Sequence, residues 1–302
     1  MRMLALVATM LIVSAVSAFA ADSGVNWEEG IITVEGTGVV NPRAVSPLQG
    51  RLGARLAAKA DAQRQLLEIV KGVNVDAETT VENMMLTSDV ITTRVSGVLT
   101  GARIVAEKEI NGGYVVTMQM PMYGVSNSIA SAVLPHSTTT PQSYPAPTPS
   151  VEPSQTSIHV DISVPSTIPS LPGSSIPSAG TQTSAEKAPS GKAYGKYTGL
   201  IVDCTGLGLN PVMSPVVKNA NGEPIYGHKN LDYDKVVQNG MASYTTDIRK
   251  ATRAGSNPLI VRAVRLDNHN GNPVLSLADA NRVLIENQAS GFLDNTNVVF
   301  VR

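Results

Sequence analysis

The chain has 302 residues, and its 23 basic and 24 acidic side chains give a net charge of −1 at pH 7. This balance, without a basic tail, excludes nucleic acid as an expected partner. The single cysteine, Cys204, excludes a disulfide within the chain, so hydrophobic cores must stabilise the folded parts.

Residues 1–20 have the pattern of a secretory signal peptide. Arg2 precedes an apolar run over residues 4–16, and Ala18-Phe19-Ala20 is a small-residue cleavage signal. The run is too short to span a bilayer well, and a retained membrane anchor is the alternative. No cysteine follows the run, so lipid attachment is not expected. We expect cleavage after Ala20, and a periplasmic or secreted mature protein without a membrane span.

An N-terminal α+β domain is predicted over residues 27–124. β-Branched residues over 31–36 predict a strand, which Gly36-Thr37-Gly38 allows to bend or bulge. A long helix follows, capped by Ser46 and ended by Lys71-Gly72. Its expected buried face carries Leu52, Leu56, Ala60, Leu66, Leu67 and Val70.

The rest of this domain is predicted as extended chain over 73–81, a short helix capped by Thr87 or Ser88 and ending at Val98, and a hairpin. Two alternating runs, 102–110 and 114–120, flank Asn111-Gly112-Gly113, which is a strong turn signal. Together these elements predict an antiparallel sheet with helices on one face.

Four basic residues of the long helix lie away from its predicted buried face: Arg51, Arg55, Lys59 and Arg64. One interpretation is a solvated helix surface. The alternative is a contact surface for an acidic partner or an anionic polymer, which makes these four the candidate interaction residues.

Three stretches of this domain carry a resemblance to known proteins: ITVEGTGV, RLGARLAAKADAQRQLLEIVKGVNV and TTVENMMLTSDVITTRVSGVLTGARIV. Over residues 31–121 the chain resembles the LPP-twenty lipoproteins and the N-terminal domain of flagellar assembly protein T. The resemblance implies a non-enzymatic module of the periplasm or outer membrane. It brings no catalytic motif, and this chain lacks the lipidated cysteine of the lipoproteins.

Residues 135–190 hold more than half of the 19 prolines, together with many serines and threonines. Such a segment buries too little apolar surface to offset the entropy of ordering it, so we predict a long disordered linker. Residues 158–164 alternate like a strand, either by chance or as a strand that adds to a sheet edge.

A second domain, α+β or mixed α/β, is predicted over residues 194–302. The expected strands are 198–203, 212–219, 224–226, 259–266 and 298–301, and the expected helices are 232–253 and 277–288. Cys204 lies in an apolar run and is expected to be a small buried hydrophobe, with a reactive or intermolecular thiol as the alternative.

Motifs for chemistry are weak. Gly206-x-Gly208 precedes a predicted strand, whereas a pyrophosphate site needs a helix N-terminus. The four histidines lack ligand spacing and there is no second cysteine, so no zinc site is expected. The oxygen-rich loop 267–272 lacks calcium-site spacing and predicts a polar hairpin turn. We therefore predict no enzyme activity, catalytic residue, metal or cofactor.

This organisation favours an exported assembly or scaffold component of the cell envelope. Its expected partners are envelope proteins, including components of the flagellar basal body. The alternative is a binding module for a cell-wall glycan or a small ligand, and an enzyme without a recognisable motif is the third class. The sequence leaves the oligomeric state open.

Overall fold

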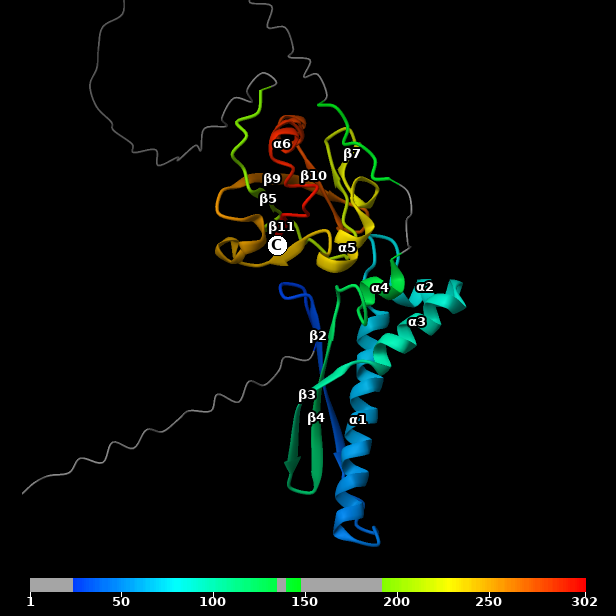
Figure 1. Ribbon diagram of the computed structural model, residues 1–302. Coiled ribbons are helices and arrows are strands. Elements are labelled where there is room, and N and C mark those ends of the chain that lie inside the picture. Colours follow the sequence, from blue (N-terminus) through cyan, green and yellow to red (C-terminus); the bar gives the residue numbers. More distant parts are fainter. Residues whose placement is uncertain (1–23, 135–139, 148–191) are drawn as a thin grey trace, which may run out of the picture. The chain divides into compact units, whose positions relative to one another are not determined.

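A computed structural model describes residues 24–134, 140–147 and 192–302 (Figure 1). These divide into two compact units. Unit 1 comprises residues 24–73 and 81–133, and unit 2 comprises residues 74–80 with everything from Leu134 onward. Each unit combines helices with a β-sheet, which confirms the predicted fold class. The predicted signal peptide and most of the predicted linker lie outside the described residues.

Unit 1 contains a four-stranded antiparallel sheet in the order β1-β2-β4-β3. The strands are β1 (Gly24–Asn26), β2 (Ile31–Val39), β3 (Arg103–Ile110) and β4 (Gly113–Pro121). The hairpin between β3 and β4 forms where it was predicted, with Gly112 at a φ of +80° in the turn.

The long helix α1 (Pro47–Lys71) packs on one face of this sheet, against β2 and β4 (Figure 1). As predicted, the Ser46 hydroxyl caps it by accepting a hydrogen bond from the Gln49 N–H, at 3.2 Å. The predicted short helix is α3 (Asp89–Thr100), and its Ser88 hydroxyl caps it by accepting from the Ile91 N–H at 3.4 Å; the helix before it, α2 (Val81–Thr87), was not predicted. A further short helix, α4 (Ile129–Val133), follows the sheet.

The predicted buried face of α1 is wrong over its first half. The buried residues recur every four positions: Gly50, Ala54, Ala58, Ala62, Leu66 and Val70. Leu52, Leu56 and Ala60 are exposed instead. Of the predicted set, only Leu66 and Val70 are buried.

Two glycines of β2 explain this reversal. A Cβ atom added at Gly36 would overlap the backbone of Ala58 and Ala62, and one at Gly38 would overlap the backbone of Ala54. The helix lies so close to the strand that only small residues fit between them. The predicted bend at these glycines is also wrong, because β2 stays in continuous register with β4 through both of them.

Unit 2 contains a seven-stranded mixed sheet in the order β7-β6-β10-β9-β5-β11-β8. The strands are β5 (Gly199–Asp203), β6 (Val217–Lys218), β7 (Pro224–Tyr226), β8 (Ser243–Thr245), β9 (Pro258–Asp267), β10 (Asn272–Leu275) and β11 (Val298–Val301). Strands β9, β5, β11 and β8 are parallel to one another, and β10 is antiparallel to β9. The predicted strand 212–219 is reduced to β6.

The helices of unit 2 are α5 (Tyr233–Asn239) and α6 (Leu277–Ser290), with 3-10 turns η1 (His228–Asn230), η2 (Ile248–Lys250) and η3 (Thr252–Ala254). Helix α6 begins as predicted, with Ser276 accepting from the Asp279 N–H. The predicted helix 232–253 is wrong after Asn239, because Gly240 at a φ of +72° ends α5. Tyr244, expected on that helix, is buried in β8.

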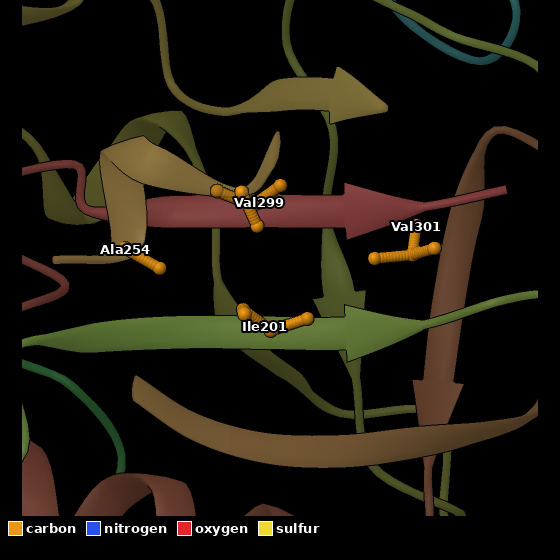
Figure 2. Packing of buried hydrophobic residues seen from close by; sticks show 5 residues of the cluster. Ile201, Ala254, Val299 and Val301 are labelled. Atoms are coloured by element: carbon orange, nitrogen blue, oxygen red, sulfur yellow. The ribbon is translucent and has the colours of Figure 1, made fainter. Parts of the chain in front are cut away.

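Part of the unit 2 core lies between the central strands and η3 (Figure 2). Ile201 of β5 and Val299 and Val301 of β11 contribute to one buried cluster with Ala254 of η3. β-Branched side chains on adjacent parallel strands pack in this way when a sheet is covered.

Two segments expected elsewhere belong to unit 2. Residues 74–80 join it through backbone hydrogen bonds from Met213 to Asn74 (3.0 Å) and from Ser214 to Val75 (2.8 Å). Residues 140–147, which fall within the predicted linker, also lie on unit 2, where the Gln142 N–H donates to the Lys229 carbonyl at 2.8 Å. The linker prediction is therefore wrong for these eight residues.

Candidate interaction surfaces

The outward face of α1 carries a row of exposed apolar side chains, which we call the leucine ridge: Val45, Leu48, Leu52 and Leu56. Leu48, Leu52 and Leu56 lie two positions from the buried residues, and two positions are about 200° of helical turn. Their exposed fractions are 60, 50 and 68%, and Val45 just before the helix is 93% exposed. An apolar row with this exposure is typical of a surface that binds a partner.

The flanks of the ridge differ in character. Arg51, Arg55 and Lys59 lie on one side, at four-residue spacing. Gln49, Gly53 and Ala57 lie on the other side, and a Cβ at Gly53 would meet nothing within 4 Å. The ridge is therefore bordered by a basic flank and a small-residue flank.

The predicted arginines of the basic flank already have acidic partners on β3. The Arg55 guanidinium donates two hydrogen bonds to the Glu107 carboxylate, at 2.9 and 2.7 Å, and lowers its pKa. Arg51 lies 3.9 Å from Glu109. Lys59 has no ion pair within the described ranges. The flank is thus largely neutralised by its own unit.

The fourth predicted residue, Arg64, continues the line of the ridge two turns beyond Leu56. It pairs with Asp61 at 3.0 Å and with Glu68 at 2.8 Å. Such exposed pairs are screened by water and contribute little to stability. The acidic-partner interpretation of the four basic residues stays a prediction.

One edge of the unit 1 sheet is β3, which is exposed along its whole length. Its pairing with β4 is interrupted by a bulge between Ile104 and Ala106, and Glu107, Lys108 and Glu109 follow. Bulges and charged side chains are features that keep an edge from pairing with another strand. The ridge is therefore the better docking surface of unit 1.

Unit 2 has a groove of about 480 Å³ beside η1. Its lining includes Lys218, His228 and Lys229, together with Val216, two prolines and several polar residues, and no carboxylate is among them. Lys218 pairs with Asp267 at 2.7 Å. Burial lowers the pKa of His228, whose Nε2 has no hydrogen-bond partner in the described part of the chain. The groove suits a ligand with an anionic group and an apolar body.

The remaining chemical features are structural. Cys204 is buried, as expected, and burial raises its pKa to about 12. Gly206 and Gly208 have left-handed φ angles and are followed by irregular chain, which excludes the dinucleotide arrangement. No group of three or more potential metal-ligating side chains occurs among the described residues.

The loop 267–272 is a polar hairpin turn, as expected, and it also holds residues 74–80. Asn268, His269 and Asn270 all have left-handed φ angles. The Asn268 side chain donates to Glu78 at 2.7 Å, and His269 Nδ1 lies 3.2 Å from the Ala77 carbonyl oxygen. His269 is thus a structural contact.

One buried ion pair attaches the start of the C-terminal domain to α6. Glu286 is fully buried and accepts hydrogen bonds from the Tyr194 and Gly195 N–H groups, at 2.9 and 3.2 Å. Arg282 lies 2.9 Å from Glu286 and 4.4 Å from the centre of the Tyr194 ring. Since every group of this pair contacts its own unit, we assign it a stabilising role.

Comparison with known proteins links unit 2 to one domain family. Residues 199–302 match the family model described as the second domain of Treponema pallidum Tp0624. The match begins at β5 and extends through β11, and it covers less than half of the chain. No curated protein matches the sequence. The matched region does not include residues 31–121, so the resemblance stated for them stays a prediction.

The sequence analysis missed the ridge because it assigned the leucines to the core. A usable signal was present: Gly50, Ala54, Ala58 and Ala62 repeat every four residues, and Gly36 and Gly38 alternate on the preceding strand. Small residues in both patterns indicate a close helix–strand contact. That contact leaves the leucines outside.

Proposed function

We propose that this protein is an exported, non-enzymatic envelope component that acts in assembly by binding a partner through the leucine ridge. The exposure of Leu48, Leu52 and Leu56 is the observation that carries the proposal. Leaving three leucines in water at helical spacing is unfavourable unless a partner covers them. The resemblance of residues 31–121 to envelope and flagellar proteins supports the same class of function.

A capture experiment tests the use of the ridge. Tagged wild-type protein, a Leu52→Glu/Leu56→Glu variant and a Leu86→Glu control are incubated with envelope fractions. Leu86 is equally suited to substitution, because it is 81% exposed on α2, away from the ridge. We expect the wild type and the control to capture the same proteins and the ridge variant to lose them. Equal capture by all three would exclude the ridge as the docking surface.

Cell fractionation tests the proposed location. We expect a mature protein that begins at Ala21, in the periplasm or medium, and that sediments with flagellar bases if the flagellar assignment holds. None of the helices in the described ranges is long and apolar enough to cross a bilayer. A full-length cytoplasmic product would contradict export.

The groove of unit 2 favours a second candidate, a binding module for an anionic cell-wall polymer. Lys229 is the cation of its lining that has no acidic partner in the described residues, because Lys218 pairs with Asp267 and burial favours the neutral form of His228. Co-sedimentation with purified peptidoglycan tests this, using Lys229→Glu and, as a control in unit 1, Lys59→Glu. The module is supported if only Lys229→Glu weakens binding, and it is excluded if the wild type stays in the supernatant.

A further inference from the structure

We infer that residues 140–147, which we call the strap, complete the groove of unit 2, so that an anionic cell-wall polymer binds there only while Tyr144 holds the strap in place. The inference rests on the second candidate function, since it names what forms and controls that same groove. Three observations carry it. The strap lines the groove, its hydrogen bonds hold the residue that supplies the free cation, and Tyr144 anchors it from the opposite side.

The strap forms part of the wall of the groove. Gln142, Ser143 and Pro145 belong to the strap, and the other lining residues come from β6, β7, η1 and the chain beside them. The family match begins at residue 199, so it includes those elements but not the strap. A ligand site must be concave to bury most of its ligand. Without the strap the groove would lose these three residues and open to solvent on that side.

The strap also fixes the backbone that carries Lys229. The Gln142 N–H donates to the Lys229 carbonyl oxygen at 2.8 Å. The Asn230 side-chain amide donates to the carbonyl oxygens of Gln142 and Ser143, at 3.2 and 3.4 Å. Lys229 is the lining cation without an acidic partner in the described residues. The strap therefore positions the residue that would contact an anionic group.

Tyr144 is directed away from the groove. It lies between two lining residues, Ser143 and Pro145, but does not line the groove itself. This alternation is that of an extended chain, in which successive side chains point to opposite sides. The side chain is partly buried, and burial, followed by the charge of Asp294, raises the pKa of its hydroxyl. Tyr144 is thus a positioning residue, which acts on a ligand only through the strap.

Docking of the strap has opposing contributions. It gains from burying the Tyr144 ring and from the hydrogen bonds to Lys229 and Asn230. The Tyr144 hydroxyl opposes it, because this group is buried without a hydrogen-bond partner in the described part of the chain. A ligand that contacts both the strap and Lys229 favours the docked state. By reciprocity, docking of the strap raises the affinity for that ligand.

Substitutions of Tyr144 in the full chain test this coupling. Co-sedimentation with increasing amounts of purified peptidoglycan gives an apparent Kd, which equals the intrinsic Kd divided by the docked fraction of the strap. We expect Tyr144→Ala to bind about tenfold more weakly, as for a strap that is docked about a tenth of the time. Tyr144→Phe keeps the anchoring ring and removes the unpartnered hydroxyl, so it should bind as tightly as the wild type or more tightly.

Two results at this position would overturn the inference. One is equal binding by Tyr144→Ala and the wild type, since the groove would then not need the anchor. The other is a Tyr144→Phe protein that binds as weakly as Tyr144→Ala, since the hydroxyl and not the ring would then act.

A second pair of variants removes one hydrogen bond and leaves the Tyr144 ring in place. Gln142→Pro deletes the N–H that donates to the Lys229 carbonyl oxygen, and Gln142→Ala retains it, while both remove the glutamine side chain. We expect Gln142→Pro to bind more weakly than Gln142→Ala. Circular dichroism with unchanged thermal transitions checks that each variant folds. Should Tyr144→Ala fail to fold, equal binding by the two Gln142 variants overturns the inference.

Hydrogen exchange measures docking of the strap without a ligand. Exchange is followed by mass spectrometry in the peptide that covers residues 140–147. We expect it to be slow in the wild type and in Tyr144→Phe, and about tenfold faster in Tyr144→Ala, because exchange follows the opened fraction. Fast exchange in the wild type would show an undocked strap and overturn the inference.

The outcomes separate this inference from the function proposed for the groove. If the wild type and Tyr144→Ala bind peptidoglycan equally and Lys229→Glu binds it weakly, the groove keeps its function and the role of the strap is refuted. If all three bind equally, the polymer uses another surface, and both proposals fail. A wild type that stays in the supernatant also refutes both. Weaker binding by Tyr144→Ala and by Lys229→Glu supports both.

Discussion

Replacing Gly38 by alanine tests the close packing of α1 on β2. The new methyl group would overlap the Ala54 carbonyl oxygen and lie 2.6 Å from the Ala58 amide nitrogen. Both are backbone atoms of a 25-residue helix, so no side-chain rotamer relieves the contact and the helix must move off the sheet. Overpacking costs about 1–3 kcal/mol, and a backbone obstacle places this variant near the upper end.

The same change at Gly53 is the matched control. Gly53 lies on the exposed part of the same helix, where a Cβ meets nothing within 4 Å. Replacing a helix-interior glycine by alanine there stabilises the helix by about 0.8–1 kcal/mol. The same glycine-to-alanine change is therefore expected to lower the free energy of unfolding at Gly38 and to raise it at Gly53.

Thermal unfolding followed by tryptophan fluorescence measures both variants. The only tryptophan, Trp27, lies in unit 1, so its signal reports that unit separately. A loss of about 3 kcal/mol lowers the Tm of a domain of this size by roughly 12–24 °C, and the Gly53→Ala variant should unfold a few degrees above the wild type. A Gly38→Ala protein with an unchanged Tm would refute the close contact between β2 and α1.

The other predictions concern single side chains. Glu286→Ala leaves a cation buried without its partner, so urea unfolding should show a loss of about 3–5 kcal/mol in unit 2, and an unchanged midpoint would contradict the assigned role. Arg55 lowers the pKa of Glu107, so the stabilisation by this pair is present above the ordinary pKa of 4.5 and is lost as the pH falls through the lowered value. The difference in free energy of unfolding between the wild type and Arg55→Met should therefore decrease towards zero in acid. A constant difference from pH 7 to 3 would contradict this stabilisation. Cys204, with its pKa raised to about 12, should react with a thiol reagent at pH 8 only after unfolding, and fast labelling of the native protein would show that it is accessible. The Tyr144 hydroxyl is buried without a hydrogen-bond partner in the described residues, so Tyr144→Phe should leave the stability of unit 2 equal or higher, whereas a clear loss would reveal a missing partner.

The elements that the sequence predicted well are those with local causes. Ser46 and Ser276 cap α1 and α6 because a serine hydroxyl accepts a hydrogen bond from the backbone N–H three residues later, whatever surrounds the helix. The hairpin at Asn111-Gly112 follows from the left-handed conformation that glycine adopts readily. The strand β11 at the end of the chain is an uninterrupted apolar run, which is typical of a covered parallel strand.

The failures come from pairings between distant segments. The apolar residues of 232–253 fit a helical period, yet Gly240 ends α5 and Tyr244 enters a strand beside β11. Residues 74–80 follow α1 in the chain but belong to unit 2, through contacts with Ser214 and Asn268 far along the sequence. No local pattern reports such partners.

The sequence by itself determined where α1 begins and ends, that a strand and a hairpin accompany it, and that its first half is rich in alanine and leucine. Only the tertiary structure decided which of those residues are buried. Hydrophobicity alone favours burying leucine, but the distance of the helix from β2 is set by Gly36 and Gly38, and at that distance only glycine and alanine fit. The leucines are exposed for this reason, and together they form the candidate interaction surface.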